Sequence, residues 1–227
     1  NRGIACAKGE LFVILDSDDQ FVTTCLEKMA KLWDGCKDRD SFCGVMGKSM
    51  TNGKMIGRPF PEGLHSLSYV EYHYGDYAGW FLDCCECLRT DILKRYSWPE
   101  NLETKFVPEN YVMDQIGLKY KLLLTNEIFM DKVYENDGIT NNVDNYVKKN
   151  ICGYLYNAIS KIEIILQKAK KTELKPTAGK YMWCYYWQLV KMDAEQKGPR
   201  IKHISLLGYA MWFRYNLVQI VKSILGK

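Results

Sequence analysis

Short apolar runs alternate with helical apolar stripes over the first 146 residues. The run LFVIL at residues 11–15 is rich in strand-forming residues and too short for a helix, so it predicts a buried strand. The next apolar residues, at positions 26, 29, 30 and 33, have helical spacing and predict an amphipathic helix. This alternation predicts an α/β domain, in which helices cover a sheet.

Turn and cap signals predict several more elements. The first ten residues predict the end of a helix that closes at Gly9. Asn52-Gly53 lies between two strand-like runs and predicts a tight β-hairpin. A helix is expected to begin just after Pro108. Residues 79–96 are expected to form a strand followed by a short helix. Residues 121–135 are expected to form one or two strands, and residues 136–142 a loop.

The pattern becomes helical and basic from about residue 146 onward. Near the C-terminus, apolar residues recur with helical spacing at positions 201, 204, 207, 211, 215, 218, 221 and 224–225. The longest apolar-leaning run there, residues 204–213, is too short to span a bilayer. We therefore expect an α/β domain at residues 1–145 and a basic amphipathic helical extension at residues 146–227.

The composition indicates a folded core and an uneven distribution of charge. Apolar residues make up 47% of the 227 residues, which excludes disorder of the whole chain. The formal net charge is only +4, but residues 1–146 hold 16 Lys/Arg against 23 Asp/Glu, whereas residues 147–227 hold 15 against 4. An acidic half of this kind suits cations, and a basic half suits anions.

The nine cysteines favour a reducing compartment. Their number is odd and no signal peptide is visible, so we expect free thiols in a cytoplasmic protein. Cys84 and Cys87 form a C-x-x-C, but no second pair and no nearby histidine completes a zinc set. Half-buried thiols in a strand are the expectation for this pair.

Three aspartates directly follow the first predicted strand. Ligands of open α/β sheets bind beyond the carboxyl ends of strands, which is where Asp16, Asp18 and Asp19 fall. If the strand stays extended, Asp16 and Asp18 share a face and Asp19 points the other way. A solvated turn that caps a helix would explain the same residues. The order of buried strand, D-x-D-D and amphipathic helix favours a ligand-binding site over such a turn.

Three kinds of site compete to explain such an acidic strand end. An EF-hand-like calcium loop is rejected, because Phe21 stands where the sharp turn needs glycine. The placement of the D-x-D after a hydrophobic strand also resembles a haloacid-dehalogenase-like phosphatase, but Gln20 stands where that family has Thr or Val. This phosphatase stays the alternative enzyme. The third is a nucleotide-sugar site, in which carboxylates hold Mg²⁺ or Mn²⁺ against the donor's two phosphates.

The surroundings of the aspartates resemble a known enzyme family. NRGIACAKGELFVILDSDDQF (residues 1–21) is similar to the middle of the catalytic domain of family 2 glycosyltransferases, with Asn-x-Gly, Ala-x-Gly, a hydrophobic strand and Asp-Ser-Asp-Asp. Residues 88–142 resemble the later part of the same enzymes, closest to the bacterial subset that builds capsular and other surface polysaccharides. The resemblance implies a GT-A fold, a Rossmann-like mixed sheet with flanking helices.

The resemblance also implies roles for individual residues. Asp18 would be the main metal ligand with Asp19 beside it, and Asp16 would lie near the nucleotide ribose or the metal. Glu109 falls where the family has its catalytic base, although Asn110 follows it where many relatives have aspartate. Asp114, one helical turn on, is the second candidate for the base. The expected reaction is an inverting transfer from a nucleotide-diphosphate sugar to a hydroxyl acceptor, with Mg²⁺ or Mn²⁺ as cofactor.

The expected partners follow from the same resemblance and from the basic tail. The acceptor would be a glycan or a lipid-linked glycan. The C-terminal helix, with its lysine, arginine and aromatic residues, suits the inner face of an anionic cell membrane, or packing on the domain or on a second copy. Nucleic acid is not expected, because the positive charge is mixed with large apolar residues. A binding or membrane-docking module without activity is the non-enzyme alternative.

The family's domain opens with a nucleotide-binding βαβ region that does not precede Asn1. At ~30 residues for each βαβ unit, about 60–90 residues are expected upstream. We therefore expect residues 1–145 to be an N-terminally truncated catalytic domain that turns over little donor alone.

Overall fold

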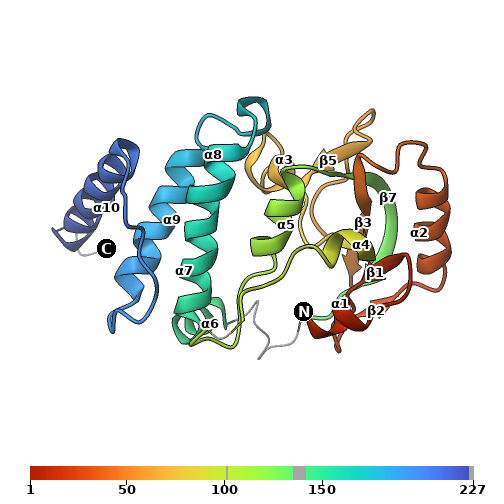
Figure 1. Cartoon of the computed structure of the whole chain (residues 1–227), viewed down its shortest axis with the longest axis horizontal. Helices are drawn as coiled ribbons and strands as arrows, with labels where there is room; N and C mark the ends of the chain where they lie inside the picture. Colours follow the sequence, from red (N-terminus) through yellow and green to blue (C-terminus); the bar gives the residue numbers. More distant parts are fainter. Residues whose placement is uncertain (101, 135–141, 225–227) are drawn as a thin grey trace. The chain divides into compact units, whose positions relative to one another are not determined.

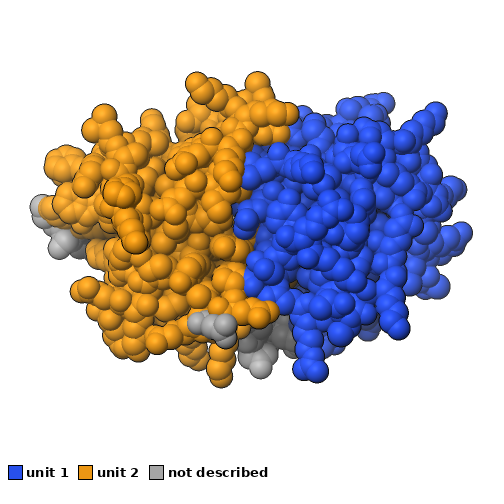
Figure 2. Space-filling view, viewed as in Figure 1, with its two compact units in different colours: residues 1–98, 112–141 blue, residues 99–111, 142–227 orange. Residues whose placement is uncertain are grey.

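A computed structural model of the chain describes residues 1–100, 102–134 and 142–224, with side chains as far as Val221. The chain forms two compact units (Figures 1 and 2). Unit 1 comprises Asn1–Trp98 and Val112–Asn141, and unit 2 comprises Pro99–Tyr111 and Asn142–Lys227. The division into a catalytic domain at residues 1–145 and an extension at 146–227 stays a prediction, and the compact units follow a different boundary.

Unit 1 is built on a mixed sheet, as the sequence predicts. The central strands β3 and β7 run parallel, and β6 is antiparallel to both β1 and β3. Along the main path the order is β1-β6-β3-β7-β2, with β4 paired to β3 and β5 to β7. The strands are β1 (Leu11–Val13), β2 (Gln20–Phe21), β3 (Phe42–Thr51), β4 (Lys54–Met55), β5 (Ser66–Ser68), β6 (Cys85–Arg89) and β7 (Lys121–Asp131).

Two glycines in or beside β3 are required by the backbone. Asn52 and Gly53 have φ angles of 50° and 71° and close the β3–β4 hairpin, which confirms the hairpin prediction. Gly44 has a φ of 152°, and a Cβ there would lie 2.1 Å from the carbonyl oxygen of Cys87 on β6. Only glycine lets these two strands approach so closely.

Helix α2 (Cys25–Asp34) packs against one face of the sheet, while α3 (Tyr69–Tyr74) and α5 (Asn110–Gly117) lie on the other (Figure 1). Cys25, Met29 and Trp33 form the buried side of α2 and contact strands β3, β6 and β7. The predicted stripe is correct at positions 29 and 33, but Leu26 is 61% exposed and Ala30 is exposed as well. The buried side of α2 therefore starts one residue earlier than predicted, at Cys25, because the predicted apolar stripe did not include this cysteine.

The first strand is shorter and less buried than predicted. Strand β1 ends at Val13, and Ile14 and Leu15 are 43% and 46% exposed. Strand β1 stands at the end of the strand order and, within the described residues, pairs only with β6, so its other side has no neighbouring strand to cover it. The preceding helix, α1 (Arg2–Cys6), ends at Ala7 and not at Gly9, because Ala7 already has an extended backbone.

The strand with a short helix predicted within residues 79–96 and the helix predicted after Pro108 are confirmed. Helix α4 (Thr90–Leu93) follows β6 directly, and α5 begins two residues after Pro108. Helix α3 begins with a capping box between Ser68 and Glu71. Residues 136–141 of the expected loop lie outside the described residues.

Unit 2 is helical, as predicted for the C-terminal part. Its segments are α6 (Val143–Lys149), α7 (Ile151–Ser160), the π-helical turn η2 (Lys161–Ile165), α8 (Leu166–Lys168), η3 (Lys171–Glu173), α9 (Ala178–Met192) and α10 (Leu206–Ile224). Trp183 and Tyr186 of α9 fill its core. No helix in the described part of the chain is long and apolar enough to cross a membrane.

Candidate active site

Three strands of unit 1 end at the same edge of the sheet. Because β6 is antiparallel to both β1 and β3, and β3 is parallel to β7, strands β1, β3 and β7 run in one direction. The residues after β1 and β7, and those just before the oppositely directed β6, therefore meet at one edge. This is the edge at which open α/β sheets bind ligands.

The acidic turn, residues 16–19, follows β1 at this edge. The amide N–H of Asp19 donates to the carbonyl of Asp16 over 3.2 Å, which closes the turn. Asp16 and Asp18 are exposed. The chain is no longer extended here, so the expected alternation of faces along the three aspartates does not apply.

Asp19 differs from the other two aspartates because its carboxylate is buried. The side chain is 5% exposed and lies 3.3 Å from the ammonium of Lys132. Its other oxygen accepts a hydrogen bond from the backbone N–H of Val133 over 3.2 Å. Asp19 therefore ties the acidic turn to the end of β7, and both of its oxygens already have partners.

Lys132 is the site residue that sequence reasoning missed. Burial of its ammonium lowers the pKa, but the carboxylates of Asp19, Asp83 and Asp16 outweigh burial, so the pKa is raised. Asp83, just before β6, also accepts a hydrogen bond from the hydroxyl of Tyr134. Burial and Asp83 together raise the pKa of Tyr134. The sequence signal was a lysine and a tyrosine just after the last strand, at the edge where the aspartates lie.

A divalent cation fits this edge only if a bound substrate supplies part of its coordination shell. In the described residues no group of three or more His, Cys, Asp or Glu side chains could hold a metal ion. Asp18 and Asp16 nevertheless offer exposed carboxylate oxygens, which suit Mg²⁺ or Mn²⁺. Mg²⁺ commonly takes one or two protein carboxylates and completes its shell with substrate phosphates and water. The residues present match that arrangement.

The cysteines are free thiols, and within the described residues none belongs to a group that could hold a metal ion. All nine are unpaired, and both Cys84 and Cys87 are buried, deeper than the half-buried state expected. Burial raises the pKa of the Cys84 thiol to about 11 and that of Cys87 to about 12. Both therefore remain neutral thiols at physiological pH.

Glu109 stands directly before α5, in unit 2. Its side chain is exposed and stands at the N-terminal end of the helix, where the macrodipole is positive. Asn110, where many relatives have aspartate, accepts a hydrogen bond from the amide of Asn157 on α7 over 2.8 Å. The asparagine thus fastens the start of α5 to α7, and a second carboxylate is absent beside Glu109.

Asp114, the second candidate for the base, is held inside unit 1. It is 1% exposed, and its Oδ1 lies 2.5 Å from Nδ1 of His73. Its Oδ2 accepts a hydrogen bond from the hydroxyl of Tyr74. Both oxygens bind α3, so Asp114 joins α5 to α3. Of the two candidates, Glu109 is the one whose carboxylate is exposed.

Comparison with known proteins agrees with part of the sequence prediction. Residues 1–96 match the family model described as glycosyl transferase family 2. A search of curated proteins found no match to the chain. The matched segment includes the acidic turn, Asp83 and the strands up to β6, and it ends before Glu109 and Asp114. The match supports a glycosyltransferase, and the mixed sheet with its flanking helices is of the GT-A type.

Proposed function

We propose that the protein is an inverting glycosyltransferase, which moves a sugar from a nucleotide-diphosphate sugar to a hydroxyl of a glycan or lipid-linked acceptor in bacterial cell-surface polysaccharide synthesis. The observation that carries the proposal is the family 2 match over residues 1–96, which contains the acidic turn at the sheet edge. The donor class comes from that family likeness. The surface-polysaccharide role comes from the resemblance of residues 88–142.

In this proposal the two exposed aspartates of the turn bind the donor. Asp18 would hold Mg²⁺ or Mn²⁺ together with the donor's phosphates, and Asp16 would lie near the ribose or the metal. When bound, the cation neutralises the charge that develops on the departing nucleoside diphosphate. Asp19, with its carboxylate bound to Lys132 and Val133, would hold the turn in place and would not be a primary ligand.

Lys132 has a second role in this proposal. The acidic turn would repel a diphosphate, and an ammonium among three carboxylates offsets part of that repulsion. Its burial beside Asp19 also fixes the position of the charge. A fixed positive charge near the phosphates needs no rearrangement when the donor binds.

Glu109 is proposed as the general base. A sugar hydroxyl is a poor nucleophile until its proton is removed, and a positioned carboxylate can take that proton as the hydroxyl attacks the anomeric carbon. Attack on the face opposite the nucleotide inverts the anomeric configuration. The exposed position of Glu109 suits contact with an acceptor.

The proposal is tested by incubating the protein with a panel of nucleotide-sugars, with and without Mn²⁺. The measurement is the release of nucleoside diphosphate. Asp18→Asn and Glu109→Gln are each expected to lower the rate about 10²-fold or more, as removal of a general base or a metal ligand does. Asp34→Asn, which alters an exposed carboxylate on α2, is the matched control.

Three results would contradict the proposal. Wild-type rates in Asp18→Asn or in Glu109→Gln would remove the role assigned to that residue. Release of phosphate from simple phosphomonoesters, with no turnover of nucleotide-sugars, would favour the phosphatase alternative. Turnover of neither substrate class would favour a binding module.

A further inference from the structure

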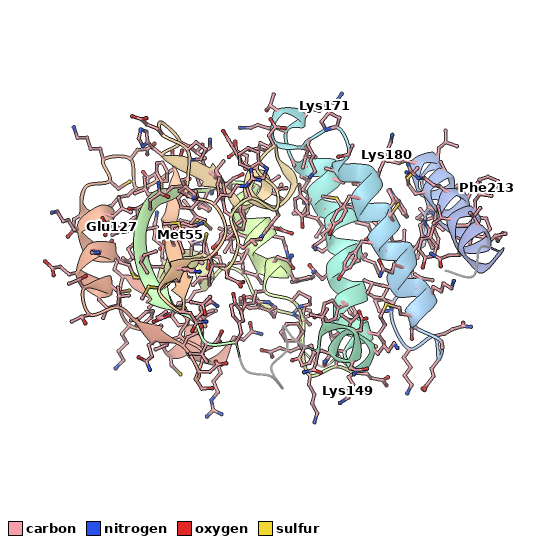
Figure 3. All side chains as sticks on the ribbon, turned by 180° about the vertical axis from the view of Figure 1, so that it is seen from behind. Met55, Glu127, Lys149, Lys171, Lys180 and Phe213 are labelled. Atoms are coloured by element: carbon pink, nitrogen blue, oxygen red, sulfur yellow. The ribbon has the colours of Figure 1, made fainter. Side chains whose placement is uncertain are left out.

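Helix α10 has an apolar stripe that faces solvent. The stripe, here called the outer stripe, recurs at helical spacing along one side of the helix. Its members, with their exposed fractions, are Leu206 (87%), Tyr209 (57%), Phe213 (66%), Leu217 (51%) and Ile220 (56%). Figure 3 shows Phe213 projecting from α10 on the side away from α9. No charged residue interrupts the outer stripe.

The opposite side of α10 is already fixed to α9, so the outer stripe is not available for packing within unit 2. The indole N–H of Trp187 donates to the carbonyl of Gly208 over 3.0 Å, and Met211 is buried beside Cys184. A Cβ at Gly208 would lie 2.7 Å from the ring of Trp183. The helix is therefore apolar on both sides. Exposed apolar patches of this kind mark surfaces that bind proteins or membranes.

The charge of the C-terminal segment favours an anionic surface over a second copy of the chain. From Lys197 to Lys227 the sequence contains six Lys/Arg and no Asp or Glu. Lys202, which precedes the outer stripe in sequence, and Arg214, which directly follows Phe213, are both exposed. In a symmetric dimer the same patch would face itself and bring these like charges together. Anionic headgroups would attract them.

A cationic cavity between α9 and α10 adds an independent observation. The cavity has a volume of about 660 Å³, and both Lys191 and Arg214 line it. The other polar residues that line it are uncharged, including Gln188 and Gln219, and none is acidic. Two cations that face a hollow beside an apolar helix suit the phosphate of a lipid headgroup.

We propose that α10 docks the protein on an anionic lipid bilayer. The outer stripe enters the interface in the plane of the membrane, and Lys191 and Arg214 bind headgroup phosphates. Tyr209, Trp212 and Phe213 add aromatic side chains of the kind that is enriched at this depth. The proposal does not depend on the chemistry assigned to unit 1.

Flotation of the full chain with vesicles tests the proposal. Binding is expected to vesicles of phosphatidylcholine mixed with phosphatidylglycerol, and much less to phosphatidylcholine alone. The double variant Leu206→Ser/Leu217→Ser is expected to abolish binding. Leu26→Ser, at a leucine of α2 that is 61% exposed, is expected to bind like wild type. Circular dichroism and a thermal melt confirm that each variant is folded.

A charge variant tests the cavity separately. Lys191→Gln/Arg214→Gln is expected to weaken binding at least about fivefold for each cation removed. Lys31→Gln/Lys54→Gln, at two exposed lysines of unit 1, is the matched control. Wild-type affinity in the cavity variant, or equal binding to both kinds of vesicle, would overturn the headgroup assignment.

Two further results would overturn the whole proposal. One is failure of the wild-type chain to bind anionic vesicles. The other is a dimer in solution that Leu206→Ser/Leu217→Ser converts to a monomer without any effect on vesicle binding. In that case the outer stripe would be an interface between copies.

Discussion

Asp18 and Asp19 are neighbours in sequence with different environments. Asp18 is exposed in the acidic turn, whereas the carboxylate of Asp19 is buried against Lys132 and the N–H of Val133. A buried carboxylate needs its partners to offset the loss of hydration, and an exposed one does not. The two residues should therefore respond differently to substitution, one in stability and the other in chemistry.

Lys132→Met tests this difference. The substitution keeps much of the side-chain volume but leaves Asp19 without its cation, so the free energy of unfolding should fall by about 1–3 kcal/mol. Urea denaturation measures the change, with Lys54→Met at an exposed lysine as control. Asp18→Asn should change stability by less than about 0.5 kcal/mol, as surface substitutions usually do. An unchanged unfolding midpoint in Lys132→Met would mean that Asp19 is not held by this pair.

At the scale of elements, Asp114 joins two helices. Its carboxylate binds both His73 and Tyr74 of α3, and a Cβ at Gly117 of α5 would lie 2.8 Å from the Cβ of Tyr69. The helices are thus held at close approach by one buried carboxyl group. Loss of that group should loosen the α3–α5 contact, while loss of Glu109 should not.

Asp114→Ala is therefore expected to lower the free energy of unfolding by about 1–3 kcal/mol, because it removes the buried acceptor to which Tyr74 and His73 bind. Asp114→Asn, which keeps hydrogen-bonding atoms, should recover part of that loss. Corrected for the folded fraction, the turnover of nucleotide-sugar by both variants should stay near wild type. If the Asp114 variants instead keep normal stability and lose turnover, Asp114 would be the base in place of Glu109.

The elements that were predictable are those fixed by local signals. Asn52-Gly53 specifies its hairpin through two positive φ angles, and Pro108 marks the start of α5. The end of β1 was not predictable from LFVIL, because strand length depends on a partner that is distant in sequence. The same holds for the site. The acidic turn is visible in sequence, but the contact of Asp19 with Lys132 depends on the antiparallel pairing of β2 with β7, where Gln20 lies opposite Asp131.

At the scale of the whole molecule, five of the nine cysteines are buried in unit 1. Burial raises the pKa of Cys43 to about 12, although a backbone hydrogen bond and Arg89 lower it in part. Burial likewise raises the pKa of Cys25 to about 11, against a weaker effect of Lys28. Cys84 and Cys87 are shifted in the same direction. In the unfolded chain all of these thiols would ionise near their ordinary pKa of about 8.5.

The shifts predict a loss of stability in alkaline solution. Above the ordinary thiol pKa the unfolded chain releases protons that the folded chain keeps, so the free energy of unfolding falls as pH rises toward 11–12. Each fully buried thiol contributes a slope of up to about 1.4 kcal/mol per pH unit. Lys132, whose pKa is also raised, acts in the same direction at still higher pH.

Urea denaturation under reducing conditions at pH 8 and pH 10 measures this slope. Cys43→Ala should reduce the difference in the free energy of unfolding between pH 8 and pH 10, because Cys43 is fully buried. This holds whatever the effect of the substitution on absolute stability. Cys6→Ala, at an exposed cysteine, should leave the wild-type difference unchanged. Equal stability of the wild-type chain at the two pH values would mean that the thiols of unit 1 reach solvent, and that its core is more open than the packing of α2 on the sheet implies.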